Sequence, residues 1–270
     1  MGRADVRIGG RILTSLVVLI VLLALIGPYI TPYDPIDVGP PSEQFLPPSS
    51  DHLFGTDQVG RDVFSRVLAG ARPSLAVAAV VVTFSVIVGT SLGLLAGLGS
   101  RAADEVVMRV TDAFFAFPYL ILAMAVVASL GRGTMSLILA LCVIWWPSYA
   151  RQVRGHALAI RATPLVDGSA MAGNSLVRTA FRHVLPQMYP ELLVRVTLDI
   201  GNVILIASAL GFLGLGVSPP TPDWGAILFE ARTNVLSAWW LAVFPGLALT
   251  LAILVFSLYG DALSRRLNHG

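Results

Sequence analysis

The sequence predicts an all-α integral membrane protein with about six transmembrane helices. Of its 270 residues, 56% are hydrophobic and only 13% are charged, whereas charged residues make up about 25% of an ordinary soluble domain. Six apolar stretches recur along the chain, each close to the length that crosses a bilayer core of about 30 Å. A chain with this composition belongs in lipid.

Composition also argues against several other classes of protein. The 18 basic residues are all arginine, and they exceed the 16 acidic residues by only 2. Such a small, dispersed charge does not predict nucleic-acid binding. The single cysteine, Cys142, lies in an apolar stretch, and the histidines lack metal-ligand spacing. Neither a disulfide framework nor a metal site is therefore expected in this chain.

The first apolar stretch, residues 12–30, follows a basic segment that contains Arg3, Arg7 and Arg11. It is long enough to span a bilayer. It ends in a Gly-Pro-Tyr sequence, not in the small-residue cleavage site of a signal peptide. We therefore expect a retained first helix.

Five further spans are predicted, and prolines at 118, 147 and 245 are expected to begin, end or kink them. In the second span Gly89, Gly93 and Gly97 recur every four residues, a spacing that predicts close contact with a neighbouring helix. The predicted ranges are 74–98, 113–130, 134–150, 193–215 and 239–259.

The arginines predict which side of the membrane each loop occupies. With the N-terminus inside, thirteen of the 18 arginines lie on the cytoplasmic side and five lie outside, as expected from the positive-inside rule. Both termini are therefore expected in the cytoplasm. The expected organisation is an N-terminus with the first helix (1–31), an extracytoplasmic loop (32–73), a five-helix core (74–260) and a cytoplasmic tail (261–270).

The extracytoplasmic loop is rich in proline and then reads G-T-D-Q-V-G-R-D-V-F-S-R from Gly55 to Arg66. Its second half is expected to form a short amphipathic helix, with Val63, Phe64 and Val67 on the apolar face. Two interpretations of its alternating acids and arginines stay open. They pair with one another at the surface, or they meet a partner protein.

The cytoplasmic loop 151–192 is predicted to hold two short helices, Pro164–Ala172 and Leu176–Val184. Gly173 and Asn174 break the first helix, and Pro186 is expected to stop the second. A polar connector whose arginines face lipid headgroups is the alternative interpretation.

This loop resembles the E-A-A loop of permease subunits in bacterial ABC importers. Gly173 and the Leu185-Pro186 pair stand at the family's spacing, with Asp167, Gly168 and Ser169 in place of the triplet. The resemblance implies a coupling helix that docks on the ATPase subunit. Asp167 keeps a carboxylate on a shorter stem than glutamate, and Gly168 lowers helix propensity by about 1 kcal/mol relative to alanine.

Two further patterns narrow the resemblance to the peptide and nickel branch of these permeases, and together with a third they extend it over most of the chain. They are the Gly55–Arg66 motif, F-L-G-L-G-V-S-P-P-T-P-D-W-G from Phe212 to Gly225, and G-D-A-L at 260–263. The resemblance implies a type I ABC-importer permease core with an extra N-terminal helix, in a bacterial or archaeal cytoplasmic membrane. It also implies a second permease, two ATPase subunits and an extracytoplasmic substrate-binding protein as partners.

Absent motifs fit that assignment. The sequence contains neither a G-x-x-x-x-G-K-[ST] phosphate loop nor a G-x-S-x-G nucleophile elbow. The chain is therefore not expected to be an enzyme or to hold a cofactor, and ATP and Mg are expected on the partner subunits. The implied cargo is a di- or oligopeptide. Nickel or another small solute is the alternative cargo, and a secondary transporter or channel is the alternative class.

One pair of ionisable residues falls inside a predicted span. Arg195 and Asp199 are four residues apart, so they share a helix face and can pair. Ionisable groups at membrane depth are candidates for function. The pair is interpreted either as structural or as part of a pathway or gate.

Overall fold

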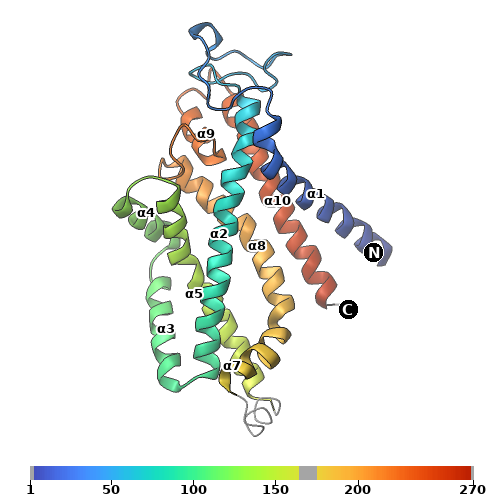
Figure 1. Cartoon of the computed structure of the whole chain (residues 1–270), viewed down its shortest axis with the longest axis vertical. Helices are drawn as coiled ribbons and strands as arrows, with labels where there is room; N and C mark the ends of the chain where they lie inside the picture. Colours follow the sequence, from blue (N-terminus) through green and yellow to red (C-terminus); the bar gives the residue numbers. More distant parts are fainter. Residues whose placement is uncertain (1–2, 164–174, 269–270) are drawn as a thin grey trace.

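The computed structural model describes residues 3–163 and 175–268. Within these ranges the regular structure is helical, with a single isolated bridge between Thr56 and Asp62. Figure 1 shows an elongated bundle. The 31–62 segment, which includes the short 3-10 helix η1 (Pro41–Glu43), covers one end, called the loop end. The helix α7 (Leu176–Thr179) lies at the other, called the α7 end.

Helix α1 (Arg3–Ile30) contains the first predicted span and packs along α2 (Val63–Leu98) and α10 (Trp240–Asn268). Most of its large apolar side chains are exposed, as expected for a helix at the edge of a bundle in lipid. It leads toward the loop end, whereas α10 leads away from it, so both chain termini point away from that end (Figure 1).

Helix α2 begins well before the predicted start at residue 74. Asp62 caps its N-terminus by accepting a hydrogen bond from the backbone N–H of Ser65 at 2.8 Å, as acidic caps commonly do. The separate amphipathic helix predicted around Val63 is therefore wrong, because that segment is the first turn of α2. Val63 is buried with Trp240 and Leu241 of α10, which extends the apolar core to this turn.

The glycines of α2 pack against α5 (Thr134–Arg161), as their spacing predicts. A Cβ atom placed on Gly93 would lie 2.7 Å from both the carbonyl oxygen of Ala150 and the Cβ of Val153. Gly89 and Gly97 are equally crowded by α5. The backbones of the two helices therefore lie close together between Gly89 and Gly97.

The predicted span 113–130 is not one helix. It comprises the end of α3 (Arg101–Phe115) and the whole of α4 (Tyr119–Leu130), which meet at an angle of 89°. Pro118 stands directly before α4, where its missing N–H costs no hydrogen bond. Ser100 caps α3, which therefore begins before the predicted start at residue 113. Because of the bend, two short helices stand where one span was expected.

Pro186 does not stop a helix, contrary to the prediction. Helix α7, the π-helical turn η2 (Ala180–Val184) and α8 (Leu185–Phe212) follow one another without a break. A proline inside an α-helix lacks the N–H for its i−4 carbonyl and crowds that group. The wider π turn accommodates Pro186 here, with the Leu185 N–H bonding to the carbonyl of Ala180.

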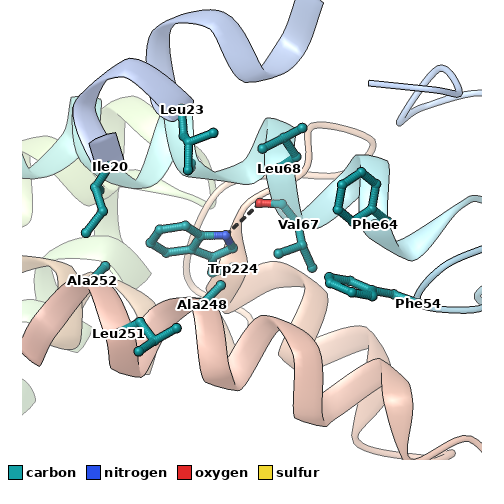
Figure 2. Close-up of a pocket in the computed structure, with 11 residues that line it drawn as sticks. Ile20, Leu23, Phe54, Phe64, Val67, Leu68, Trp224, Ala248, Leu251 and Ala252 are labelled. Carbon is teal, nitrogen blue, oxygen red and sulfur yellow. Dashed lines mark hydrogen bonds between the residues drawn. The ribbon is translucent and has the colours of Figure 1, made fainter. Parts of the chain in front are cut away.

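The short helix α9 (Trp224–Ala231) fills the space between α8, α10 and the upper part of α2. Asp223 caps α9 and accepts a 2.6 Å hydrogen bond from the hydroxyl of Ser74 in α2. Burial raises the pKa of the Asp223 carboxyl. The Trp224 indole donates to the carbonyl of Val67 at 2.8 Å inside an apolar pocket of about 220 Å³ between α1, α2 and α10 (Figure 2).

Within the described residues, four helices are long and apolar enough to cross a membrane, and the bent pair of α3 and α4 makes a fifth if it counts as one span. The sequence predicts about six. The difference is α5, whose first half matches the predicted span 134–150 but whose second half carries Arg151, Arg154 and Arg161.

Candidate functional site

A polar stripe runs along one face of α8. Arg195, Asp199 and Asn202 follow one another at intervals of four and three residues, so they lie on one side of the helix. The Arg195 Nε donates to Asp199 Oδ2 at 2.7 Å. Asp199 is only 3% exposed, whereas Asn202 is exposed near the middle of the helix. A polar side chain exposed at this depth favours a face that meets water or protein rather than lipid.

Helix α5 supplies the remaining partners of Arg195. Its Nη1 donates to Gln152 Oε1 at 3.1 Å, and its Nη2 donates to Ser148 Oγ at 3.0 Å. The guanidinium also stands 5.1 Å from the centre of the buried Tyr149 ring. Arg195 thus has hydrogen-bond acceptors on two helices, so its side chain joins α5 to α8.

A cavity of about 330 Å³ lies beside this pair, between α8, α5 and the break of the α3–α4 pair. One part of its wall is aromatic, from Phe115, Tyr119 and Trp145, and the other part carries the polar groups. Such a mixed lining can accept a solute that has both charged groups and apolar side chains. The polar lining residues are Ser148, Arg195, Asp199 and Asn202.

A second cavity, of about 350 Å³, lies nearer the α7 end. It is lined by residues from the start of α8 and the end of α10, among them Pro190, Glu191 and Leu267. Arg195 and Gln152 belong to this second cavity as well, and Arg195 also lines the first. The Arg195 side chain therefore stands between two cavities along the bundle.

Sequence reasoning identified Arg195 and Asp199 but missed their companions. Ser148, Gln152 and Asn202 are uncharged, and single polar residues within an apolar run do not stand out in a sequence. The available signal is spacing, because Ser148 and Gln152 are four residues apart and Asn202 extends the α8 pair by one turn.

The predicted coupling residues divide into two groups. Asp167, Gly168, Ser169 and Gly173 lie outside the described residues. Leu185 and Pro186 form the start of α8, directly after the π turn.

The helices on either side of this segment are tied to the bundle. Arg161, at the end of α5, donates to the carbonyl of Gly99 at 3.3 Å, and His156 pairs with Glu191 of α8 at 2.5 Å. Arg151 pairs with Asp112 of α3 at 2.5 Å, and Arg154 pairs with Asp104 of the same helix. These bonds join α5 to the start of α8, to the C-cap of α2 and to α3.

The charges of the Gly55–Arg66 motif pair with one another, but they are buried and they reach across the chain. Arg61 bonds to Asp57 and to Glu230 of α9, at 2.7 Å each. Arg66, whose side chain is 1% exposed, bonds to the same two carboxylates. This four-residue set, the ion-pair cluster, fixes the loop to α9. Pairing at the surface, as one interpretation expected, does not describe it.

No group of three or more His, Cys, Asp or Glu side chains that could hold a metal ion occurs within residues 3–163 and 175–268. The buried thiol of Cys142 lies in the apolar core between the helices.

Known proteins resemble this chain in sequence and in fold. Residues 89–269 match the family described as binding-protein-dependent transport system inner membrane component. The probable D,D-dipeptide transport system permease protein DdpC of Escherichia coli is 39% identical over 92% of this chain and 83% of its own length. The di/tripeptide transport system permease protein DppC of Pseudomonas aeruginosa is 42% identical over 91% of this chain and 82% of its own.

The glutathione transport system permease protein GsiD of Pectobacterium atrosepticum is 40% identical over 92% of this chain and 82% of its own length. Among solved structures, a chain of the MetNI methionine ABC transporter in an inward-facing conformation has a TM-score of 0.60. That match covers 74% of this chain and 95% of the other, at 20% identity.

Proposed function

Because the chain belongs to the family of binding-protein-dependent transport system inner membrane components, we propose that it is the permease subunit of an ATP-driven importer of di- or oligopeptides. The predicted type I permease core is confirmed by the family match and by the likeness of fold to the MetNI chain. Peptide cargo is supported by relatives 39–42% identical whose names refer to dipeptides, glutathione and di- or tripeptides.

The importer contains two ATPase subunits, which bind ATP and Mg, together with a second permease and an extracytoplasmic binding protein. The dependence on a binding protein is part of the family's description. The lack of a phosphate-loop motif in this sequence supports an ATPase site on other subunits.

The α7 end faces the cytoplasm and the loop end faces outward. Two observations support this orientation. Thirteen of the 18 arginines then fall on the cytoplasmic side, in line with the positive-inside rule. In addition, both termini point away from the loop end (Figure 1).

The Arg195–Asp199 pair acts as a gate on the transport pathway, and the observation that carries this proposal is that Arg195 lines two cavities at once. Its bonds to Ser148 and Gln152 hold α5 beside α8. The predicted loop 151–192 is largely helical, because α5 runs to Arg161 and α7 begins at Leu176. When the ATPases close, the connection between α5 and α7 moves α5 and α8 and changes these bonds. The permease pair then alternates between inward-facing and outward-facing states.

Uptake measurements test the function directly. Cells with and without this chain are given a labelled dipeptide and labelled nickel in parallel, before and after ATP depletion. Loss of ATP-dependent peptide uptake without the chain is the expected result. Loss of nickel uptake alone would make nickel the cargo in place of peptides. Uptake that needs the chain but resists ATP depletion would overturn the ATP-driven importer mechanism.

The coupling role is tested by Gly173→Trp, which places a bulky side chain where the resemblance expects a tight break. Transport should fall to background and the ATPases should uncouple or detach, while the chain still inserts into the membrane. Gly155→Trp is the matched control, since nothing lies within 4 Å of a Cβ atom placed there. Normal uptake by Gly173→Trp would contradict the assignment of Gly173 to ATPase coupling.

A further inference from the structure

The loop end carries large apolar side chains that the proposed orientation puts in water rather than in lipid. Tyr33, Ile36, Val38 and Leu53 are between 43% and 65% exposed, although they lie in the polar 31–62 segment beyond the end of α1. Exposed apolar groups in water that are bordered by polar ones commonly mark a protein–protein contact. These four residues, with Asp34 and Asp37, are called the outer patch.

Four residues of the outer patch line the same cavity. Tyr33, Val38, Asp34 and Asp37 all line one cavity of about 230 Å³. The Tyr33 ring lies 4.9 Å from the ring of His52, and its hydroxyl donates to the carbonyl of Asp51 at 3.0 Å. His52 lines the same cavity, and Leu53 follows it in the chain.

The outer patch rests on a fixed support. Backbone N–H groups of Gly39 and Phe45 donate to the carbonyls of Val59 and Asp57, at 3.1 Å each. The indole of Trp240 in α10 donates to the carbonyl of Thr56 at 3.1 Å. The ion-pair cluster adds side-chain bonds from Arg61 and Arg66 to Glu230 of α9. A surface that is already ordered loses little conformational entropy when a partner binds.

The charge of the patch selects the kind of partner. Of the six acidic residues in 31–62, Asp57 and Asp62 are buried, as is the single arginine, Arg61. The four acidic residues that are at least partly exposed are Asp34, Asp37, Glu43 and Asp51. Asp34 and Asp37 are exposed, and neither has an ion pair in the part of the chain that the structure describes. An acidic surface disfavours anionic lipid headgroups and favours a protein surface with lysine or arginine.

We propose that the outer patch is where the extracytoplasmic binding protein docks, through a surface that combines apolar side chains with basic ones. This inference rests on the proposed function, which requires a binding protein, and on the proposed orientation. It adds the location of the contact and the chemistry of the partner's surface.

Binding of the purified binding protein to the assembled permease–ATPase complex in lipid nanodiscs tests the inference. Asp34→Asn with Asp37→Asn should weaken binding at least about tenfold and flatten its dependence on salt, because two screened attractions are lost. Asparagine keeps the acceptor for the Ile36 N–H that Asp34 now provides at 2.9 Å. Ile36→Ser with Val38→Ser should weaken binding to a similar extent at all salt concentrations.

Matched controls lie in the exposed connection between α9 and α10, at the same end. Thr233→Lys with Ser237→Lys changes the net charge by the same amount as the double asparagine variant, and Val235→Ser with Leu236→Ser removes a similar exposed apolar pair. Both controls should bind like the unaltered complex. ATPase activity without the binding protein should be unchanged in every variant, whereas its stimulation by the binding protein should be lost in the patch variants only.

Three outcomes would overturn the inference. Patch variants that bind like the unaltered complex exclude the patch, and weakening by the controls alone moves the contact to the α9–α10 connection. Patch variants that instead fail to assemble with the second permease make the patch a permease contact. The proposed function fails separately, if the unaltered complex neither binds nor responds to the binding protein.

Discussion

Arg66 is the residue whose environment departs furthest from what its charge leads one to expect. Its side chain is 1% exposed, and it bonds to Asp57 and Glu230. Arg61 shares both carboxylates, so the ion-pair cluster contains two positive and two negative charges. Removing one member of a buried pair is costly because it leaves its partner uncompensated in a region of low dielectric.

Glu230→Gln should therefore lower the free energy of unfolding by about 3 kcal/mol, since it leaves two buried arginines with one carboxylate. Asp112→Asn is the control, because Asp112 and Arg151 form a pair whose side chains are 64% and 48% exposed. An exposed pair contributes about 0–1 kcal/mol. Unfolding in mixed micelles, followed by tryptophan fluorescence, measures both variants.

A compensating change separates charge balance from packing. Glu230→Gln combined with Arg66→Met leaves Arg61 and Asp57 as a neutral pair, so the double variant should recover part of the stability lost by Glu230→Gln. A double variant less stable than either single variant would contradict the account of the cluster in terms of charge.

The contact between α2 and α5 depends on residues that have no side chain. Gly93 faces Ala150 and Val153 at distances that leave no room for a Cβ atom. Without a hydrophobic force between helices in lipid, close packing of this kind is a main source of helix association.

Gly93→Ala should lower the free energy of unfolding by about 1–3 kcal/mol, because the two backbones must move apart. Gly155→Ala, on the open side of α5, should instead be neutral or raise it by up to about 1 kcal/mol, through helix propensity. The same unfolding measurement compares them. Equal effects of the two substitutions would show that the association of α2 with α5 does not depend on close contact at Gly93.

The elements differ in how far the sequence predicts them. Long apolar runs and the glycine spacing predict the spans and the α2–α5 contact, because both follow from local composition and periodicity. Pro118 signals a break, but the 89° angle between α3 and α4 depends on how each leg packs on its neighbours. Likewise, Pro186 predicts an interruption of the α-helix. Whether the helix stops there or continues through a π turn depends on how it packs in the folded protein.

For the site, the sequence supplies the charged pair and the structure supplies its surroundings. Arg195 and Asp199 are recognisable because ionisable groups are rare in spans. That Ser148 and Gln152 bond to the same guanidinium requires knowing which face α5 turns toward α8. The pairing of Arg61 and Arg66 with Glu230 could not be predicted either, because these residues are far apart in the sequence.

At the scale of the whole molecule, Arg195 stands between two cavities. We therefore expect the access of water to the polar face of α8 to change with the state of the transporter. The polar face of α8 should be reachable from one side of the membrane at a time. A thiol placed on that face reports this, because reagents for thiols react with the thiolate, which forms in water and not in lipid.

In a Cys142→Ser background, Asn202→Cys should react with an impermeant maleimide from the cytoplasmic side without ATP and lose that reactivity when ATP is trapped. Leu247→Cys on α10, at a residue 53% exposed, is the control and should stay unreactive because it faces lipid. If the thiol at position 202 is as unreactive as the control in both states, the pathway does not run along this face.

The ion-pair cluster also imposes an order on how the chain is made. Arg66 and Glu230 are 164 positions apart, so at about 5–20 residues per second the ribosome delivers them roughly 8 to 33 seconds apart. During that interval α2 and the helices that follow it are made while Glu230 is still missing from the cluster. The 31–62 segment therefore reaches its final packing only after α9 has been synthesised.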